Sequence, residues 1–239
     1  MDERFRRLKS IDTPTITNVV ASYPDNHEVC MGIYNPWRCN WYTDETCKCM
    51  FPELGPKAGY AVTAVVGEAD PSFSRLSNVD LFKAVEASPK PVIVVVHQGM
   101  DKKLKRKNGM YGGIMTTALK NLGCVGCVSD GPSRDLNEIR GLDFQYLLTG
   151  VAAGHGNFAI YAVNIPVSVC GMDVAPGEIV HMDENGAVKF PAERIDDILM
   201  RAEKLIESET KIIQKIKEAA SGDEIAKIMS GFTDMKNND

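Results

Sequence analysis

An arginine and an aspartate stand side by side at Arg134 and Asp135, directly after the turn sequence GPS. A guanidinium group presents a planar fork of donors that matches a carboxylate or an enolate oxygen. An aspartate carboxylate is a hard oxygen ligand suited to Mg²⁺ or Mn²⁺, ions that need only one or two protein carboxylates. The pair therefore predicts a site that holds a carboxylate substrate together with a divalent metal ion.

Two adjacent glycines, Gly112 and Gly113, precede a segment with the apolar spacing of a helix. Glycine lets the backbone come close to a ligand. The free N–H groups of Gly113, Ile114 and Met115 at the start of such a helix favour an anion. They are candidates to bind the carboxylate of the same substrate.

The elements around these residues predict that they meet. PVIVVVH (91–97) and CVGCVSD (124–130) are predicted strands, and the helix that begins at Gly113 joins them. Parallel strands joined by one helix need a right-handed crossover, so the loops after both strands emerge at the same edge of the sheet. Ligands favour that edge in open α/β sheets. Two structural alternatives stay open here: the Arg–Asp pair as a surface ion pair or helix cap, and the Gly-Gly as a plain turn.

The rest of the chain predicts one mixed α/β domain, residues 1–239, with a mainly helical C-terminal extension over 192–239. Hydrophobic periodicity and turn residues predict the individual elements. They are a capped helix (12–22), a strand (58–67), a helix (78–88), a strand (144–150), an antiparallel β-meander (165–191) and a helical segment to about residue 221, with MKNND frayed at the end. The segment 27–56 is expected to be irregular.

Composition excludes several classes of function. The chain has 239 residues, a net charge of −5, 44% hydrophobic and 25% charged residues, so direct binding of nucleic acid has no bulk electrostatic support. The basic run KKLKRK (102–107) is expected to be a solvated loop, or alternatively a clamp for an anionic ligand or partner. A charged N-terminus without an apolar region predicts no secretory signal, and no apolar run is long enough to span a membrane. Seven cysteines then indicate a reducing, cytoplasmic setting.

Other residues with potential chemistry have structural alternatives. Cys124 and Cys127 form a C-x-x-C half-motif, but they lie at the start of a predicted buried strand and are expected to be inert. The spacing of the cysteines at 30, 39, 47 and 49 does not match a paired zinc knuckle, which leaves a structural zinc as a minor alternative. His155 follows a glycine and could reach a ligand or simply be exposed. His181 and Asp183 are expected to be structural. Ser133 has no histidine base nearby in the sequence, which leaves a base from elsewhere in the fold as an open alternative.

Gly113, twenty residues, Arg134-Asp135 and then Glu138 together match a G-x20-R-D-x2-E/D pattern. This pattern resembles that of the RraA-like family, which includes 4-hydroxy-4-methyl-2-oxoglutarate aldolases and the regulator of ribonuclease E activity. The likeness extends to DTPTITNVVAS near the start and to the segment 165–191, and so covers roughly residues 8–220.

The resemblance implies a swivelling β/β/α-type domain that assembles into homotrimers or homohexamers. It also implies a divalent-metal-dependent lyase that cleaves a small 2-oxo acid, or decarboxylates oxaloacetate, and releases pyruvate. Carried over by position, Asp135 would bind Mg²⁺ or Mn²⁺, Arg134 would bind the pyruvyl group, and the backbone of Gly113, Ile114 and Met115 would bind its carboxylate. No lysine Schiff base is required, because a metal ion and an arginine can stabilise the pyruvate enolate.

One position departs from the family's aldolases. In those enzymes an acidic residue stands where this chain has Gly113. Glu138 or His97 would have to supply acid–base chemistry instead. The alternative that the resemblance offers is a non-catalytic regulator that binds an RNA-degrading enzyme. A methyltransferase is not supported, because the chain has no Gly-x-Gly fingerprint for a nucleotide-like methyl donor. The loop 98–110, with its basic run, is a hypothetical cover for the site that would favour di- or tricarboxylates.

Overall fold

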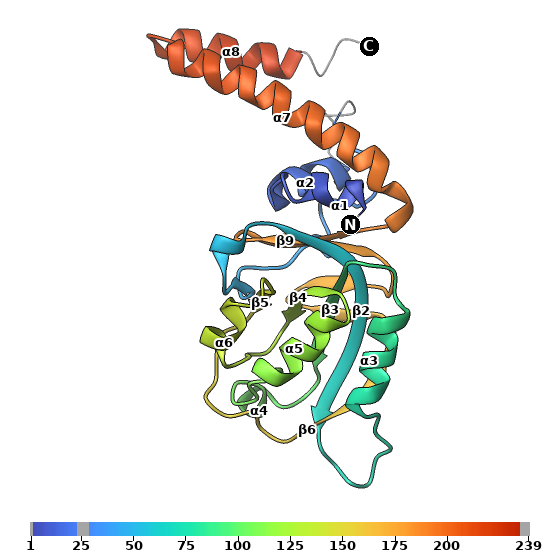
Figure 1. Ribbon diagram of the computed structural model, residues 1–239. Coiled ribbons are helices and arrows are strands. Elements are labelled where there is room, and N and C mark those ends of the chain that lie inside the picture. The colour runs from blue at the N-terminus through green and yellow to red at the C-terminus, as the bar shows by residue number, and fades with distance from the viewer. Residues whose placement is uncertain (1, 23–28, 235–239) are drawn as a thin grey trace.

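The computed structural model describes residues 2–22 and 29–234. Four parallel strands form the centre of the main sheet, in the order β5-β4-β3-β2 (Figure 1). They are β2 (Lys57–Glu68), β3 (Val92–Gln98), β4 (Cys124–Ser129) and β5 (Gln145–Leu148). A two-residue strand, β1 (Lys48–Cys49), pairs antiparallel with β5. The predicted strands at 58–67, 91–97, 124–130 and 144–150 are confirmed.

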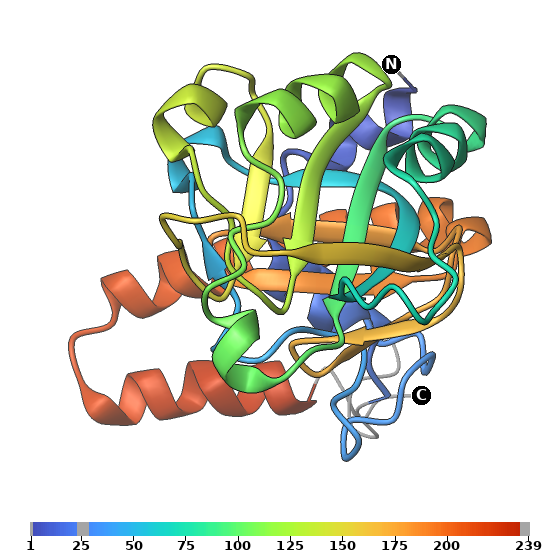
Figure 2. The ribbon, with the colours of Figure 1, turned by 90° about the horizontal axis from the view of Figure 1, so that it is seen from below.

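Helices cover one face of these parallel strands, as Figure 2 shows for α3 and α5. They are α3 (Asn78–Ala87), α5 (Gly113–Asn121) and the short α6 (Leu136–Arg140). Strand β3 alternates between two cores: Val94 and Val96 pack toward the helices, while Ile93 and Val95 pack on the opposite face. Both faces of the sheet are therefore buried, which is why its strands are continuous apolar runs.

A second β layer covers the opposite face. Strand β9 (Ile179–Asp183) pairs with the first part of β2, and β10 (Gly186–Phe190) pairs with β9. Strand β6 (Phe158–Val163) pairs with the last part of β2, and β7 (Val167–Val169) and β8 (Met172–Val174) form a separate hairpin. The twelve-residue β2 thus belongs to both layers. The order of helices, sheet and second β layer confirms the predicted β/β/α fold.

The predicted β-meander at 165–191 is wrong as a continuous unit. Its four strands exist, but they form two hairpins in different sheets, because β9 pairs with β2 rather than with β8. The turn around Pro176 and Gly177 does not reverse the chain onto β8: Gly177 donates its N–H to the carbonyl of Ala61 in β2, 2.9 Å away. A long-range partner therefore outcompetes the sequence-adjacent strand.

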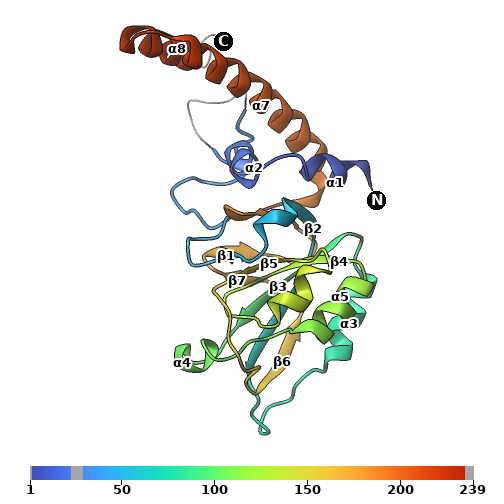
Figure 3. The same cartoon turned by 60° about the vertical axis from the view of Figure 1, so that its left-hand side comes forward.

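Helices from both ends of the chain pack together at one end of the molecule (Figures 1 and 3). These are α1 (Glu3–Leu8), α2 (Thr13–Val20) and α7 (Ile195–Glu218), and α8 (Gly222–Asp234) folds back along α7. Asp12 caps α2, since its carboxylate accepts the N–H of Thr15 at 3.0 Å. The helix predicted at 12–22 and the helical extension from 192 are confirmed; MKNND lies outside the described residues.

Three short elements complete the described chain: η1 (Pro52–Leu54), η2 (Ala192–Arg194) and α4 (Lys102–Lys105). The last is a difference from expectation, because the basic run was predicted to be a loop and instead begins with one helical turn. Asp101 caps it by accepting the N–H of Lys103 at 2.8 Å. Of the helices in the described part of the chain, none is long and apolar enough to cross a membrane.

Candidate functional site

One cavity of about 420 Å³ contains all the residues that the sequence proposed for substrate and metal. It is lined by Gly112 to Met115 from the start of α5, and by Arg134, Asp135 and Glu138 from the turn and the first part of α6. Parallel pairing of β3 with β4 places the two loops at the same sheet edge, as the strand order predicted. The roles of these side chains remain predictions; their meeting in one cavity is observed.

Asp135 directly joins the two loops. Its carboxylate Oδ2 accepts the backbone N–H of Gly113 at 3.1 Å, across 22 positions of sequence. Its backbone is left-handed, with φ of 61°, a conformation that costs most residues free energy and that Asp tolerates better than most. Although Asp135 stands before α6, its side chain makes no capping hydrogen bond there. The helix-cap alternative therefore fails for α6 but is present at α5, because the N–H that Asp135 accepts belongs to Gly113, the first residue of that helix.

Arg134 lies against the same carboxylate. Its Nε atom is 3.3 Å from Asp135 Oδ2, so the ion-pair alternative is present in the structure. Yet the buried Nε–H has no acceptor in hydrogen-bonding geometry. The side chain is about one-third exposed. A buried donor without an acceptor costs free energy in a protein interior. Such a donor is typical of a site where a ligand supplies the missing acceptor oxygen.

The carboxylate of Glu138 lies beside Gly113. A Cβ atom on Gly113 would be 3.2 Å from Cδ of Glu138 and closer still to Oε2. A Cβ on Gly112 would similarly lie 3.0 Å from Nε of Arg134 and 3.1 Å from Cγ of Asp135. Neither glycine can carry a side chain unless these neighbouring side chains move. The alternative that the Gly-Gly pair is a plain turn therefore does not account for both glycines.

The backbone carbonyl of Tyr111 fixes the loop that leads into α5. It accepts hydrogen bonds from Ser133 Oγ at 2.9 Å and from the Tyr146 hydroxyl at 3.0 Å. Ser133 Oγ is also 2.6 Å from the carbonyl of Met110. Ser133 therefore has a structural role, because its hydroxyl ties the loop before Gly113 to the turn before Arg134.

His155 and Phe158 complete the cavity wall. His155 Nδ1 is 2.7 Å from the carbonyl of Gly156, so this nitrogen carries the proton and donates. In the neutral ring Nε2 is then the nitrogen without a hydrogen, and the side chain is exposed. Sequence left this histidine undecided and did not identify Phe158 at all, because β6 gives no strong signal and lies far from the glycine turn along the chain.

The charges in the cavity fit a hydrated divalent cation. Asp135 and Glu138 contribute two carboxylates against the single guanidinium of Arg134, which leaves an excess of one negative charge. Oδ1 of Asp135 accepts no hydrogen bond from any described residue, so hard oxygen is available. No group of three or more His, Cys, Asp or Glu side chains in the described ranges could hold a metal. Mg²⁺ fits such a site because it retains several waters.

The family model for RraA-like proteins (Aldolase/RraA) matches residues 38–189, more than half of the chain. The chain belongs to the RraA-like family. The matched segment contains every residue that lines the cavity, from Gly109 to Phe158.

The sequence identity to individual curated relatives is modest. The chain is 30% identical over 129 residues to the protein named "Putative 4-hydroxy-4-methyl-2-oxoglutarate aldolase" of Halalkalibacterium halodurans, an alignment that covers 53% of this chain and 59% of that protein. The chain spans 54% and 59% of the length of two curated relatives that it matches, and 15% of the length of a third.

Two solved structures have the same fold. Streptomyces coelicolor RraAS2, described as an unusual member of the RNase ES inhibitor RraA protein family, is 20% identical with a TM-score of 0.64, covering 88% of this chain and 95% of that one. A protein from Pseudomonas syringae pv. tomato is 16% identical with a TM-score of 0.68, covering 95% and 93%. At these identities the likeness shows the RraA-like fold alone.

His97 lies outside the RraA-like cavity. Its Nδ1 donates to Oδ2 of Asp130 at 2.8 Å, and Lys105 Nζ contacts the same oxygen at 2.8 Å. Burial alone would raise the pKa of Asp130, but hydrogen bonds from His97, Lys105 and the Gln98 N–H hold it below its usual range. Asp130 is therefore ionised, and His97 does not line the cavity as an alternative acid or base.

The cysteines and His181 have structural positions. Cys124 and Cys127 are fully buried in β4, and burial raises the pKa of both thiols, as an inert pair requires. His181 is buried between the Thr13 hydroxyl and the carbonyl of Leu8, each 3.0 Å away. Asp183 accepts the N–H of Thr13 at 2.7 Å. The structural predictions for these residues are confirmed, and the alternative zinc site has no ligand cluster among the described residues.

Proposed function

We propose that this protein is a divalent-metal-dependent lyase that acts on a small 2-oxo acid and releases pyruvate, as a 4-hydroxy-4-methyl-2-oxoglutarate aldolase or an oxaloacetate decarboxylase. The observation that carries the proposal is the position of Glu138. Its carboxylate lies where a side chain at residue 113 would be. The cavity therefore contains an acidic group at the place where the resemblance expects one, although a different residue supplies it.

Arg134 is the substrate anchor in this proposal. The terminal nitrogens of its guanidinium have no acceptor among the described residues, and they can bind the 2-oxo and carboxylate oxygens of the substrate. The first-turn N–H groups of Ile114 and Met115 have no intrahelical acceptor and can bind the same carboxylate. Gly113 differs from its predicted role, because its N–H is already donated to Asp135.

Asp135 would hold Mg²⁺ or Mn²⁺. Its Oδ2 is fixed by the Gly113 N–H, which leaves Oδ1 as the oxygen that would bind the ion. When bound, such an ion would act as a Lewis acid that stabilises negative charge on the substrate's 2-oxo oxygen. It would also change the excess charge of the cavity from −1 to +1, which an anionic substrate requires.

Glu138 is the proposed proton carrier. Cleavage of the bond between C3 and C4 of a 4-hydroxy-2-oxo acid, or loss of CO₂ from oxaloacetate, leaves the electron pair as the pyruvate enolate. A proton must then be added at C3 to give pyruvate. In the retro-aldol cleavage a base must also remove the proton of the 4-hydroxyl group, because the C4–O bond becomes a carbonyl as the C3–C4 bond breaks. Glu138 can exchange this proton through one water, with Nε2 of His155 as a second acceptor in the same cavity.

The test measures pyruvate released from oxaloacetate and from 4-hydroxy-4-methyl-2-oxoglutarate by the purified protein, with Mg²⁺, with Mn²⁺ or with a chelator. Metal-dependent release from at least one substrate is expected, with a loss of at least a hundredfold in Arg134→Ala. Arg140→Ala is the matched control, since Arg140 lies at the end of α6, shortly after Arg134 in the chain, and pairs with Glu53 outside the cavity. No release with either ion, or equal activity of Arg134→Ala, would sink the proposal.

A second proposal concerns partners. Ile114 is 89% exposed at the rim of the cavity, and Val151 is 57% exposed. Exposed apolar residues beside a site suit a protein contact. We propose that this surface joins copies of the chain into a trimer or hexamer. The substitution Ile114→Glu should disrupt that oligomer, and light scattering measures the change in molecular mass. If no lyase activity is found and the protein is monomeric, the same surface favours a regulator that binds an RNA-degrading enzyme.

A further inference from the structure

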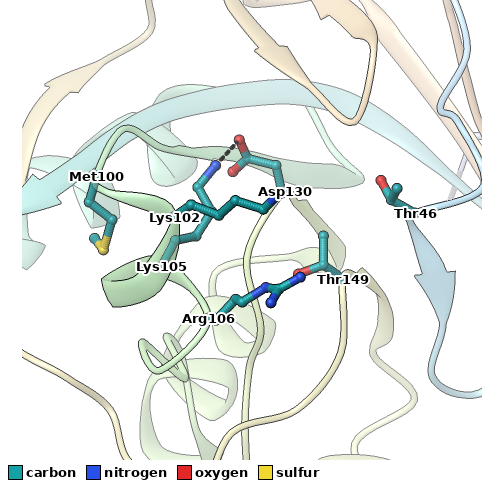
Figure 4. A pocket seen from close by; sticks show the side chains of 7 residues that line it. All are labelled: Thr46, Met100, Lys102, Lys105, Arg106, Asp130 and Thr149. Carbon is teal, nitrogen blue, oxygen red and sulfur yellow. Dashed lines mark hydrogen bonds and ion pairs between the residues drawn. The ribbon is translucent and has the colours of Figure 1, made fainter.

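A second cavity, of about 640 Å³, lies apart from the Arg134–Asp135 cavity and shares no lining residue with it. Figure 4 shows the side chains that surround it. Three cations come from α4 and its C-cap, and one carboxylate and two hydroxyls come from three other segments. The lining residues are Thr46, Met100, Lys102, Lys105, Arg106, Asp130 and Thr149. A volume of this size is within the usual range for small-molecule sites.

Helical geometry divides the basic run into two sets. Lys102, Lys105 and Arg106 are separated by three and four positions, so they share one face of α4 and point into the cavity (Figure 4). Lys103 and Lys107 belong to a different face, and Lys107 lines another hollow. The hypothesis that the loop 98–110 covers the Arg134–Asp135 site is not supported for its basic run, because no residue of 102–107 lines that cavity. Gly109, at the end of the loop, does line it.

The single carboxylate in this cavity is already satisfied. Oδ1 of Asp130 accepts the Gln98 N–H at 2.7 Å, and Oδ2 accepts from His97 and from Lys105. Asp130 therefore holds the Lys105 ammonium in place and does not neutralise the other two cations. Lys102 and Arg106 form no ion pair with any described residue, and the Thr149 hydroxyl has no hydrogen-bond partner among them. The Thr46 hydroxyl, in contrast, already has a partner, because it donates a hydrogen bond to Asp44.

We propose that this cavity is a second binding site, for a small anion that carries two or more negative charges on carboxylate or phosphate groups. Lys102 and Arg106 bind the anionic groups, Thr149 donates a hydrogen bond, and Lys105 adds a fixed positive charge beside them. The cavity's own groups sum to three positive charges and one negative. That excess of two favours a dianion or trianion over a monocarboxylate such as pyruvate. The chain's net charge of −5 argues against a long polyanion such as RNA, which would also meet the acidic remainder of the surface.

The experiment is calorimetric titration of the full chain, in metal-free low-salt buffer, with citrate and with inorganic pyrophosphate as separate arms. Binding of at least one anion at one site per chain is expected. Preference for citrate indicates a carboxylate ligand, and preference for pyrophosphate indicates a phosphate ligand. Affinity should fall at least tenfold in Lys102→Ala/Arg106→Ala. It should change by less than threefold in Lys103→Ala/Lys107→Ala, which removes the same charge from the same run.

Arg134→Ala separates this site from the proposed catalytic site, and anion binding should survive in it. Loss of binding in Arg134→Ala would place the anion in the other cavity and overturn the proposal. Equal weakening in the two double variants would also overturn it, because a diffuse positive field would then explain the affinity. So would the absence of binding in both arms. Tight binding of a single-stranded oligonucleotide that depends equally on Lys103 and Lys102 would identify a nucleic-acid surface instead.

Discussion

The Glu138 carboxylate lies beside Gly113, where the Cβ of any other residue would approach to within 3.2 Å of Glu138 Cδ. The two positions therefore compete for one volume. A carboxylate can reach this part of the cavity from residue 138 or from residue 113, but both cannot occupy it unless Glu138 moves. This relationship permits a test in which the acidic group is transferred between the two positions.

Glu138→Ala should lower pyruvate release by about 10²- to 10⁴-fold, the usual contribution of a general acid or base. Gly113→Asp alone should also be impaired, because its side chain displaces Glu138. The double variant Gly113→Asp/Glu138→Ala should recover activity relative to Glu138→Ala, since a carboxylate is restored without a clash. Steady-state rates with both substrates measure this. A double variant no better than Glu138→Ala would show that the carboxylate at this place is not the proton carrier.

Asp135→Asn should abolish metal binding while preserving the fold. Asn tolerates the left-handed backbone at this position nearly as well as Asp, but its neutral amide is a weak ligand for Mn²⁺. Asp135→Ala should lose binding and also about 1 kcal/mol of stability from the left-handed backbone. Mn²⁺ titration followed by electron paramagnetic resonance measures the first effect, and urea unfolding the second. Asp101→Asn, at the cap of α4, is the control that should bind Mn²⁺ normally.

Gly112→Ala should damage the site with little effect on stability. Its Cβ would overlap the Oδ2 atom of Asp135 and press on the end of the Arg134 side chain rather than on backbone, so the Asp135 carboxylate must move out of its present position. We expect Mn²⁺ affinity and pyruvate release each to fall at least tenfold, with a small change in melting temperature. Gly154→Ala, with nothing within 4 Å of its Cβ, is the matched control. Unchanged Mn²⁺ affinity in Gly112→Ala would contradict the placement of the ion at Asp135.

The central unit was predictable because its signals are local and strong. The run PVIVVVH alternates between two buried faces, and the glycine pair opens a helix with regular apolar spacing. Strand order alone then brings Asp135 to Gly113, as their 3.1 Å hydrogen bond bears out. The features that sequence missed depend on distant partners. His155 and Phe158 reach the cavity through β6, whose pairing with β2 has no sequence signature.

The basic run could not be assigned for a different reason. One exposed helical turn has no apolar stripe, so periodicity does not distinguish it from a solvated loop. Only the structure separates Lys102 and Arg106 from Lys103 and Lys107. Likewise, the position of Glu138 beside Gly113 depends on the left-handed backbone at Asp135, which sets the direction of α6. The spacing of residues in the sequence does not predict the direction of α6 relative to α5.

His181 should make stability depend on pH below about 6.5. The imidazole is fully buried, and burial lowers its pKa in the folded protein below the ordinary value of 6.5. Its Nε2–H donates to the Leu8 carbonyl, so Nδ1 accepts from Thr13 and carries no proton. As the pH falls through 6.5, the unfolded chain binds a proton that the folded chain resists. The free energy of unfolding should then decrease, by at most about 1.4 kcal/mol per pH unit for this one group.

Urea unfolding at pH 7.5, 6.5, 5.5 and 5.0 measures this dependence in the wild type, in His181→Gln and in His155→Gln. Glutamine can retain one donor and one acceptor without titrating, so His181→Gln should lose less stability than the wild type between pH 7.5 and 5.0. His155 is exposed, and its variant should parallel the wild type. Asp130 does not confuse the comparison, because its lowered pKa confines its effect to pH values below about 4. Parallel curves for the wild type and His181→Gln would mean that the buried imidazole is not the group that titrates.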